Sequence, residues 1–269
     1  MHVFLGNLAE KDYLCAMKDG YHIVLDRILP AGEAAEGKTA CCVHLLVADV
    51  SEMMADEELL AQQTATLSPQ RKAKATAISN LRNRALSVGV ALLFDRLLQE
   101  VGLREQDMEY VEGEHGKPVI NVEMLKSGNI EILKGGKLEF NLSHSGRMVA
   151  AAILQPSNFQ NNSTFQHFNV STFPPLHLGL DIQHITRYRP ELVRRMFNDT
   201  DRALFAACTD ETARQRLFAQ LWCRAEAFAK ATGEGLRWPF PTPPSNAHFT
   251  DFEVGEEYCG SVCVIIDNG

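Results

Sequence analysis

The stretch 156–175 divides the chain into two parts and limits how it can fold. It is rich in Asn, Gln, Ser, Thr and Phe, carries almost no charge, and shows neither alternating nor helical spacing of apolar residues. A loop of this length without structure of its own is uncommon inside a compact domain. We therefore predict two halves, 1–155 and 176–269, joined by a linker at 156–175.

The first half contains several segments with clear strand or helix patterns. Residues 41–50 are apolar and β-branched, which predicts a buried strand. A helix is expected over 68–102, because a Ser-Pro pair opens it, apolar residues keep helical spacing, and a glycine can close it. Two further strands are expected at 138–142 and 148–154, with a tight turn between them.

The second half shows the same order of strand, helix and strand. Strands are expected at 176–182 and 258–266, and a long helix is expected at 211–232, ending at Gly233. The residues themselves show no internal repeat. The order of elements in the two halves nevertheless suggests a duplicated arrangement.

Composition places the chain among ordinary globular proteins and excludes some classes of function. With 269 residues, 45% of them hydrophobic and 22% charged, the chain can bury a large core. Its net charge of −8 argues against general nucleic-acid binding. The start lacks a signal-peptide pattern, and the longest apolar run, 88–94, is too short to span a membrane. The seven cysteines include no C-x-x-C pair, so we expect reduced thiols, no zinc site and a cytoplasmic protein.

A carboxylate interrupts the apolar strand at 176–182. Alternation along the strand sends Leu178, Leu180 and Ile182 to one face, which we expect to enter the core. Asp181 and Gln183 share the other face, about 6.5 Å apart along the strand. A buried carboxylate needs a partner, and a hard cation such as Mg²⁺ is one candidate. The alternative is an aspartate bonded to backbone or solvent at a strand end.

Three large side chains form a stripe along the helix at 211–232. Trp222, Glu226 and Lys230 follow one another at intervals of four residues, so they lie on one face. A Glu-Lys pair at this spacing is often a simple surface ion pair, but the residues around it are apolar. A glutamate that binds metal or accepts a proton, beside a lysine that neutralises phosphate charge, suits phosphoryl chemistry. The sequence therefore predicts a metal-dependent site around Asp181, Glu226 and Lys230.

Two segments of the first half are candidate anion-binding loops. The stretch 140–146 leaves a strand and carries a hydroxyl, an imidazole and a glycine, and 116–118 places a lysine in a stiff turn. The first is not a serine-hydrolase elbow, because Asn141 stands where Gly is required. The second is not a P-loop, because Pro118 stands where Ser or Thr is required. Taken singly, each is better explained as a plain turn than as a site.

Together these segments resemble the Sfp-type 4′-phosphopantetheinyl transferases. The matching blocks are Gly116-Lys117-Pro118, Phe140-Asn141-x-Ser143-His144-Ser145-Gly146, Gly179-x-Asp181-Ile182 and Trp222-x-x-x-Glu226-Ala227-x-x-Lys230-x-x-Gly233-x-Gly235-Leu236. A weaker match covers 84–93. The last block is the most specific, and four blocks in the correct order are a far stronger indication than any one alone.

The resemblance implies a reaction, a fold and partners. The reaction is the Mg²⁺-dependent transfer of 4′-phosphopantetheine from coenzyme A to a serine of an acidic acyl or peptidyl carrier protein, releasing adenosine 3′,5′-bisphosphate. The sequence does not distinguish between carriers of fatty-acid, polyketide and peptide synthesis. The fold is a pseudo-twofold α+β arrangement of two similar α/β halves. Residues 1–155 would hold the nucleotide end of coenzyme A, and 176–269 would carry the metal site and the carrier-docking surface.

The resemblance also assigns roles to residues at the metal. Asp181, Gln183 and Glu226 would hold Mg²⁺, Glu226 would also be the base for the carrier serine, and Lys230 would stabilise charge on the pyrophosphate. The family usually has Glu at the position of Gln183. An amide oxygen, or a water in its place, gives less charge, so weaker metal binding is expected. Ala225 replaces a family lysine, which removes a positive charge near the phosphates.

Four residues are assigned to the nucleotide end of coenzyme A. His144, together with Ser143, Lys117 and Arg84, would hold its phosphates and adenine, and Lys230 would reach the same phosphates. These assignments follow from position in the matching blocks.

The segment 185–202 carries five arginines against three acids in a chain that is acidic overall. It is either a solvated helix or a docking surface for acidic carrier proteins, with Met196 and Phe197 as apolar anchors. Two rival functions stay open beside the transferase. One is a metal-dependent phosphoesterase, and the other is a non-catalytic module that binds coenzyme A or a carrier protein.

Overall fold

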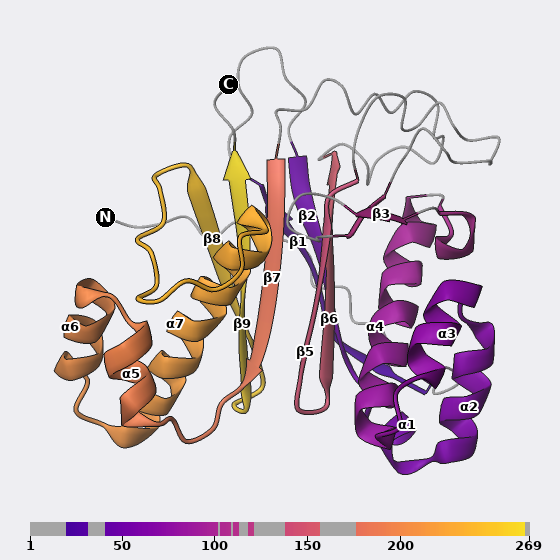
Figure 1. The fold of residues 1–269 in the computed structure, drawn as a ribbon, viewed down its shortest axis with the longest axis horizontal. Helices are drawn as coiled ribbons and strands as arrows, with labels where there is room; N and C mark the ends of the chain where they lie inside the picture. The colour runs from indigo at the N-terminus through magenta and orange to yellow at the C-terminus, as the bar shows by residue number, and fades with distance from the viewer. Residues whose placement is uncertain are drawn as a thin grey trace.

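The computed structural model describes residues 20–31, 41–101, 103–108, 110–112, 118–120, 138–156 and 176–266. The fold is α+β, as the sequence predicted, with two antiparallel sheets side by side at the centre and helices on both flanks (Figure 1). Residues 157–175, nearly all of the expected linker, lie outside the described ranges. The division into halves at 156–175 therefore stays a prediction.

The N-terminal sheet has four strands in the order β1-β2-β6-β5, and each neighbouring pair is antiparallel. Its strands are β1 (His22–Pro30), β2 (Cys41–Asp49), β5 (Phe140–Ser145) and β6 (Met148–Pro156). The strands expected at 41–50 and 148–154 are confirmed. The tight turn between β5 and β6 is also confirmed, and Gly146 supplies its left-handed conformation with φ of +60°.

The expected anion-binding turn at 140–146 is wrong in its local structure. The strand predicted at 138–142 lies instead at 140–145, and only Gly146 and Arg147 form the turn. Ser143 and His144 therefore lie on β5. Their side chains point to opposite faces of the strand, since successive residues alternate.

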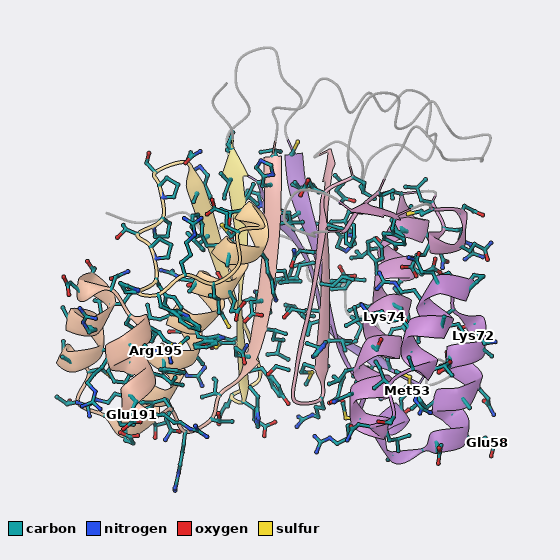
Figure 2. The ribbon with its side chains drawn as sticks, viewed as in Figure 1. Met53, Glu58, Lys72, Lys74, Glu191 and Arg195 are labelled. Atoms are coloured by element: carbon teal, nitrogen blue, oxygen red, sulfur yellow. The ribbon has the colours of Figure 1, made fainter. Side chains whose placement is uncertain are left out.

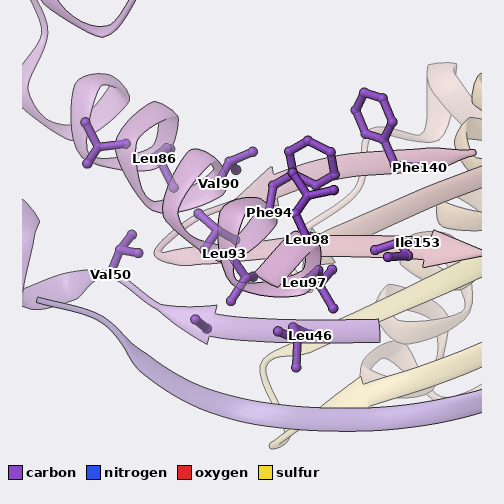
Figure 3. Packing of buried hydrophobic residues seen from close by; sticks show 14 of the residues in the cluster. Leu46, Val50, Leu86, Val90, Leu93, Phe94, Leu97, Leu98, Phe140 and Ile153 are labelled. Atoms are coloured by element: carbon purple, nitrogen blue, oxygen red, sulfur yellow. The ribbon is translucent and has the colours of Figure 1, made fainter. Parts of the chain in front are cut away.

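Four helices lie on one side of this sheet: α1 (Ser51–Ala55), α2 (Glu57–Thr66), α3 (Pro69–Thr76) and α4 (Leu81–Glu100). The apolar face of α4 packs on the sheet. Figure 3 shows Leu93, Phe94 and Leu97 of α4 beside Leu46 of β2 and Ile153 of β6, all fully buried. Beyond α4 come the short 3₁₀ turn η1 (Glu105–Asp107) and a two-stranded sheet of β3 (Tyr110–Glu112) and β4 (Pro118–Ile120).

The single helix expected over 68–102 is wrong, because the structure has two helices there. Ser68 caps α3 by accepting a hydrogen bond from the Arg71 amide at 3.4 Å, as its position predicted. Asn80 then caps α4 by accepting one from the Asn83 amide at 3.0 Å. The apolar spacing continues across the break, so periodicity did not reveal it. The helix-capping residue Asn80 was the feature of the sequence that could have indicated a second helix.

The C-terminal sheet has three antiparallel strands in the order β7 (Leu176–His184), β9 (Tyr258–Ile266) and β8 (Ala247–Val254). Its helices are α5 (Pro190–Met196), α6 (Asp199–Ala207) and α7 (Glu211–Thr232). The predicted strands β7 and β9 and the helix α7 are confirmed, and Gly233 ends α7 in the left-handed region. Helix α7 lies directly on β7 because Gly179 has no side chain: a Cβ there would stand 1.8 Å from the Ala227 carbonyl oxygen.

The two sheets share one apolar core. Leu178, Leu180 and Ile182 of β7 are fully buried, as predicted, against apolar residues of β2 and β6. The ends of the sheets are joined by Arg147, whose guanidinium contacts Asp49 of β2 at 2.7 Å and Glu257 of the β8–β9 turn at 2.9 Å. The strands that carry the candidate site are therefore held by packing from both halves.

No helix within the described ranges is both long and apolar enough to cross a membrane. Within the described part of the chain, four cysteines of the C-terminal half are free thiols: Cys208, Cys223, Cys259 and Cys263.

Candidate functional site

A pocket of about 530 Å³ opens between the N-terminal helices and the end of α7. Its N-terminal side is formed by α3 and β5 and includes Arg71, Lys74 and Phe140. Its C-terminal side is formed by α7 and the segment after it, and includes Glu226 and Lys230. Figure 2 shows Lys74 on the side of α3 turned toward the central strands. Three cations and one carboxylate thus meet in a pocket that also has apolar walls.

Asp181 lies at the base of this site and is almost completely buried, with 3% of its surface exposed. Its Oδ1 accepts hydrogen bonds from Lys230 Nζ and Ser143 Oγ, both at 2.8 Å. Its Oδ2 accepts one from Gln183 Nε2 at 3.0 Å. The carboxylate predicted to need a partner therefore has three, one of them a cation.

Lys230 uses its whole hydrogen-bonding capacity inside the protein. Its ammonium has three donors. They reach Asp181 Oδ1 at 2.8 Å, the Leu180 carbonyl oxygen at 2.9 Å and Ser143 Oγ at 3.2 Å. The lysine nevertheless lines the pocket, so an anion in the pocket would meet a charge that is already held in place.

Glu226 lies one helical turn before Lys230 and lines the same pocket. Burial raises the pKa of its carboxyl group and the nearby charge of Asp181 raises it further, while Lys230 opposes both. None of the described residues donates a hydrogen bond to Glu226. The third member of the predicted stripe, Trp222, packs instead on Phe218 and Phe240 in the core beneath α5 and α6.

The chemistry of these side chains fits a hard divalent cation. Asp181 and Glu226 offer carboxylate oxygens, which are the ligands that Mg²⁺ prefers. The charge of Asp181 raises the pKa of Glu226, and a cation held by these carboxylates would relieve that repulsion. No group of three or more Asp, Glu, His or Cys able to hold a metal occurs in the described ranges. The protein would thus supply two carboxylates and leave other positions to water or substrate.

Gln183, the third expected metal ligand, is held by its neighbours at both ends of its amide group. Its nitrogen donates to Asp181 Oδ2 at 3.0 Å, and its oxygen accepts from Ser145 Oγ at 3.4 Å. The amide nitrogen, not the oxygen, faces the carboxylate. Gln183 is therefore arranged here to orient Asp181, and its assignment to the metal stays a prediction.

Ser143 and His144, both assigned to the nucleotide, lie on different faces of β5. Ser143 is buried and points toward Asp181 and Lys230. His144 shares its face with Phe140 and Leu142, which line the pocket. The residue is exposed, but partial desolvation of its ring lowers the pKa of His144, and the positive charges of Lys230 and Lys74 lower it further.

Of the other two residues assigned to the nucleotide, Arg84 is the one within the described ranges, and it lies away from the pocket. Arg84 donates from Nε to the Ile78 carbonyl oxygen at 2.9 Å and lines a separate hollow with Glu57 and Lys72. Its side chain therefore closes the turn between α3 and α4. Lys117 lies outside the described residues, so its expected role stays a prediction.

Two basic residues of the pocket were missed by sequence reasoning. Arg71 and Lys74 lie one turn apart on α3, and both line the pocket. Arg71 is held by the buried carboxylate of Glu105 at 2.5 Å, and its guanidinium lies 5.4 Å from the ring centre of Tyr110. Their spacing of three residues just after a helix cap was the available signal, because it predicts one face of a helix.

The arginine-rich segment 185–202 forms an exposed basic surface, but its expected apolar anchors are wrong. Met196 and Phe197 are buried, with 4% and 0% exposure, in the core beneath α5 and α6. The exposed aromatic residue of this region is Trp238, and the Arg195 guanidinium lies 4.4 Å from its ring centre. Figure 2 shows Arg195 and Glu191 on α5.

Comparison with known proteins identifies relatives of one family. Residues 177–265 match the family model of the 4′-phosphopantetheinyl transferase superfamily. The chain is also similar to a protein of Nostoc sp. (strain PCC 7120 / SAG 25.82 / UTEX 2576), the 4′-phosphopantetheinyl transferase HetI, with 26% identity over 183 residues. That match covers 67% of this chain and 65% of HetI, just under two thirds of the relative's length. Both matches are to the family that the motifs resemble, and the family-model match covers the part of the chain that carries Asp181, Glu226 and Lys230.

Proposed function

We propose that this member of the 4′-phosphopantetheinyl transferase superfamily, of the Sfp type, transfers 4′-phosphopantetheine from coenzyme A to a serine of a carrier protein. One observation carries the proposal. The pocket brings Glu226 and Lys230 of α7 together with Arg71 and Lys74 of α3. Coenzyme A has a pyrophosphate and a separate 3′-phosphate, and cations on both sides of one pocket suit such a ligand.

The cations would divide the phosphates between them. Lys74 has an exposed side chain on α3 and is free to meet the 3′-phosphate at the pocket rim. Arg71 is already oriented by Glu105, so little side-chain entropy is lost when it meets an anion. Lys230 lies beside Glu226 and would meet the pyrophosphate. The lowered pKa of the His144 ring favours its neutral form, which can still donate a hydrogen bond.

Glu226 is the candidate base. The carrier serine oxygen forms a bond to the phosphorus that carries the pantetheine arm, and the bond from that phosphorus to the bridging oxygen breaks. Adenosine 3′,5′-bisphosphate leaves with that oxygen. Glu226 accepts the serine proton, for which the raised pKa of its carboxyl group suits it. Lys230 stabilises charge on the departing phosphate. A divalent cation held by Asp181 and Glu226 would neutralise pyrophosphate charge.

The carrier protein would dock on the basic surface of α5. Arg194 is exposed over 76% of its side chain, and its nearest carboxylate, Glu191, is 3.7 Å away. Arg195 lies over Trp238, which is 51% exposed and follows the pocket residues Gly235 and Leu236 in the chain. An acidic carrier meets complementary charge here, and Trp238 offers an aromatic anchor close to the pocket.

Intact-mass spectrometry of apo carrier proteins tests the function. Incubation with coenzyme A and Mg²⁺ should add one phosphopantetheine arm per carrier. Glu226→Ala should abolish the gain, whereas Glu211→Ala, an exposed glutamate at the start of the same helix, should retain it. Coenzyme A binding without transfer to any competent carrier would favour a non-catalytic module. Release of inorganic phosphate from simple esters would favour a phosphoesterase.

A further inference from the structure

Strands β5 and β7 are joined by side chains where the two sheets meet. Four amides of β7 donate to side chains of β5 or of Glu139, the residue directly before it, always between residues 39 positions apart. The pairs are Leu178 to Glu139 at 3.4 Å, Leu180 to Asn141 at 3.1 Å, Ile182 to Ser143 at 3.3 Å and His184 to Ser145 at 3.0 Å. The constant offset means that the strands run in the same direction. We call this row the β5–β7 seam.

Ser143 is the member of the seam that also reaches the charged site. Besides accepting from the Ile182 amide, its hydroxyl donates to Asp181 Oδ1 at 2.8 Å and accepts from Lys230 Nζ at 3.2 Å. A serine hydroxyl has one donor and two acceptor positions. All three are used inside the protein. Ser143 is 6% exposed, so neither a free donor nor open surface is left for a phosphate oxygen.

We infer that Ser143 is a positioning residue, which fixes the Asp181 carboxylate and the Lys230 ammonium relative to each other, and not a ligand of the nucleotide. The inference rests on the proposed function and deepens it. Through the seam, a strand of the N-terminal sheet sets the orientation of two charged groups that belong to the C-terminal half. Without the hydroxyl, the buried carboxylate loses one of its three donors, and the lysine loses one of its three acceptors.

Ser145 provides a matched control. It is a serine on the same face of β5, and it accepts the next amide of the seam at 3.0 Å. Its hydroxyl donates to Gln183 Oε1 at the longer distance of 3.4 Å and contacts neither Asp181 nor Lys230 directly. Ser143→Ala and Ser145→Ala therefore remove the same kind of seam bond. They differ in whether the charged pair loses a partner. Urea unfolding should report a loss of stability for both variants and a larger one for Ser143→Ala, because the buried charged pair also loses a partner there.

The experiment measures two affinities in the purified full chain. Titration with Mn²⁺ alone should give a dissociation constant that rises on the order of 10-fold in Ser143→Ala, as for residues that orient metal ligands. Ser145→Ala should stay within about twofold of the unchanged protein in the same titration. Titration with coenzyme A in EDTA should give dissociation constants within about twofold for all three proteins, because no phosphate contact is lost.

The opposite pattern overturns the inference. A loss of coenzyme A affinity in EDTA that is specific to Ser143→Ala would make Ser143 a nucleotide ligand. Equal Mn²⁺ losses in both variants, or no Mn²⁺ binding by the unchanged chain, would also overturn it. If Ser143→Ala does not fold, Ser143→Cys keeps the size and weakens the donor, and the same comparison applies. If the protein transfers nothing to carriers, the proposed function is wrong. The comparison of Mn²⁺ affinities between the two variants still decides the role of Ser143.

Discussion

Lys230 Nζ lies 2.8 Å from Asp181 Oδ1, so the charged ends of a helix residue and a strand residue neutralise each other at the base of the pocket. The side chain of Asp181 is 5% exposed and that of Lys230 is 29% exposed. The pair is possible because α7 approaches β7 closely at Gly179, two residues before Asp181. A missing side chain on one face of the strand thus brings the lysine within reach of the carboxylate.

Replacing Lys230 should damage both reaction and fold. Lys230→Met should lower kcat/KM for transfer on the order of 100-fold or more, because a preorganised charge at the phosphate is lost. It should also reduce the free energy of unfolding by about 3 kcal/mol, because Asp181 stays buried without its counter-ion. Transfer kinetics and urea unfolding check the two effects. Lys72→Met removes an exposed lysine of α3 and should change neither; equal effects of the two variants would remove Lys230 from the mechanism.

Lys74 should contribute to coenzyme A binding without contributing to stability. It lines the pocket with an exposed side chain, whereas Lys72 on the same helix lines only the separate hollow beside Arg84. Lys74→Ala should raise the dissociation constant for coenzyme A about 10-fold, as expected for one lost charge-assisted contact. The melting temperature should not change. Isothermal titration with coenzyme A measures the affinity of Lys74→Ala and of the control Lys72→Ala. Unchanged coenzyme A affinity in Lys74→Ala would contradict the placement of the nucleotide on α3.

The sequence predicted the C-terminal part of the site better than the N-terminal part. Asp181, Glu226 and Lys230 lie on a strongly patterned strand and helix, so periodicity placed them correctly. The orientation of Ser143 depends on contacts between β5 and β7, which are far apart in the chain and leave no local pattern. Arg71 was missed because its partner, Glu105, becomes a neighbour only when the chain folds.

Local patterns also explain which elements were missed. The edge strand β8 (Ala247–Val254) is partly exposed and carries polar residues, so it lacks the apolar run that marked β2 and β9. Helix α2 has only two buried residues, Leu60 and Thr64, and its apolar face is too narrow to reveal a period. The stability of such elements depends on the neighbouring elements they pack against, and their own apolar spacing is too weak to predict them.

Gly179 should tolerate no side chain. A Cβ there would stand 1.8 Å from the Ala227 carbonyl oxygen and 2.6 Å from the Ala231 amide nitrogen, both backbone atoms of α7. Gly179→Ala should therefore push α7 away from β7 and lower the free energy of unfolding by about 3 kcal/mol or more. Urea unfolding measures the loss.

Ser261 supplies the control for the glycine. It pairs with Asp181 across β7 and β9, is fully buried, and its hydroxyl has no hydrogen-bond partner within the described ranges. Removing that hydroxyl should cost nothing, so Ser261→Ala should unfold at the same or a higher urea concentration. A Gly179→Ala protein with unchanged stability would show that the close approach of α7 is not required.

The basic surface of α5 should govern affinity for the carrier and not for coenzyme A. Reversing Arg194 and Arg195 to Glu should raise KM for an acidic carrier about 10-fold or more while leaving KM for coenzyme A within about twofold. The carrier effect should shrink at high salt, because exposed charges are screened. Arg104→Glu reverses an exposed arginine of the N-terminal half and should change neither constant. An equal rise in KM for the carrier and for coenzyme A would contradict the assignment of this surface to carrier docking.

His44 should make stability fall in alkaline solution. The ring lies in the core of the N-terminal half, with Nε2 at 2.7 Å from Asp26 Oδ1 and Nδ1 at 3.0 Å from Glu100 Oε2. Burial alone would lower the pKa of His44, but the hydrogen bonds to both carboxylates outweigh it and raise the pKa to about 9. The folded state therefore binds a proton that the unfolded chain releases near pH 6.5.

The raised pKa of His44 determines the direction in which stability changes with pH. The contribution of the charged ring is fully present below about pH 6.5 and is lost as pH rises through about 9, amounting to about 3 kcal/mol. Urea unfolding at intervals from pH 6 to 10 should show this decline in the unchanged chain. His44→Gln cannot titrate, so its stability should be lower at pH 6 and nearly flat over the same interval. A parallel decline in both proteins would assign the pH dependence to other groups.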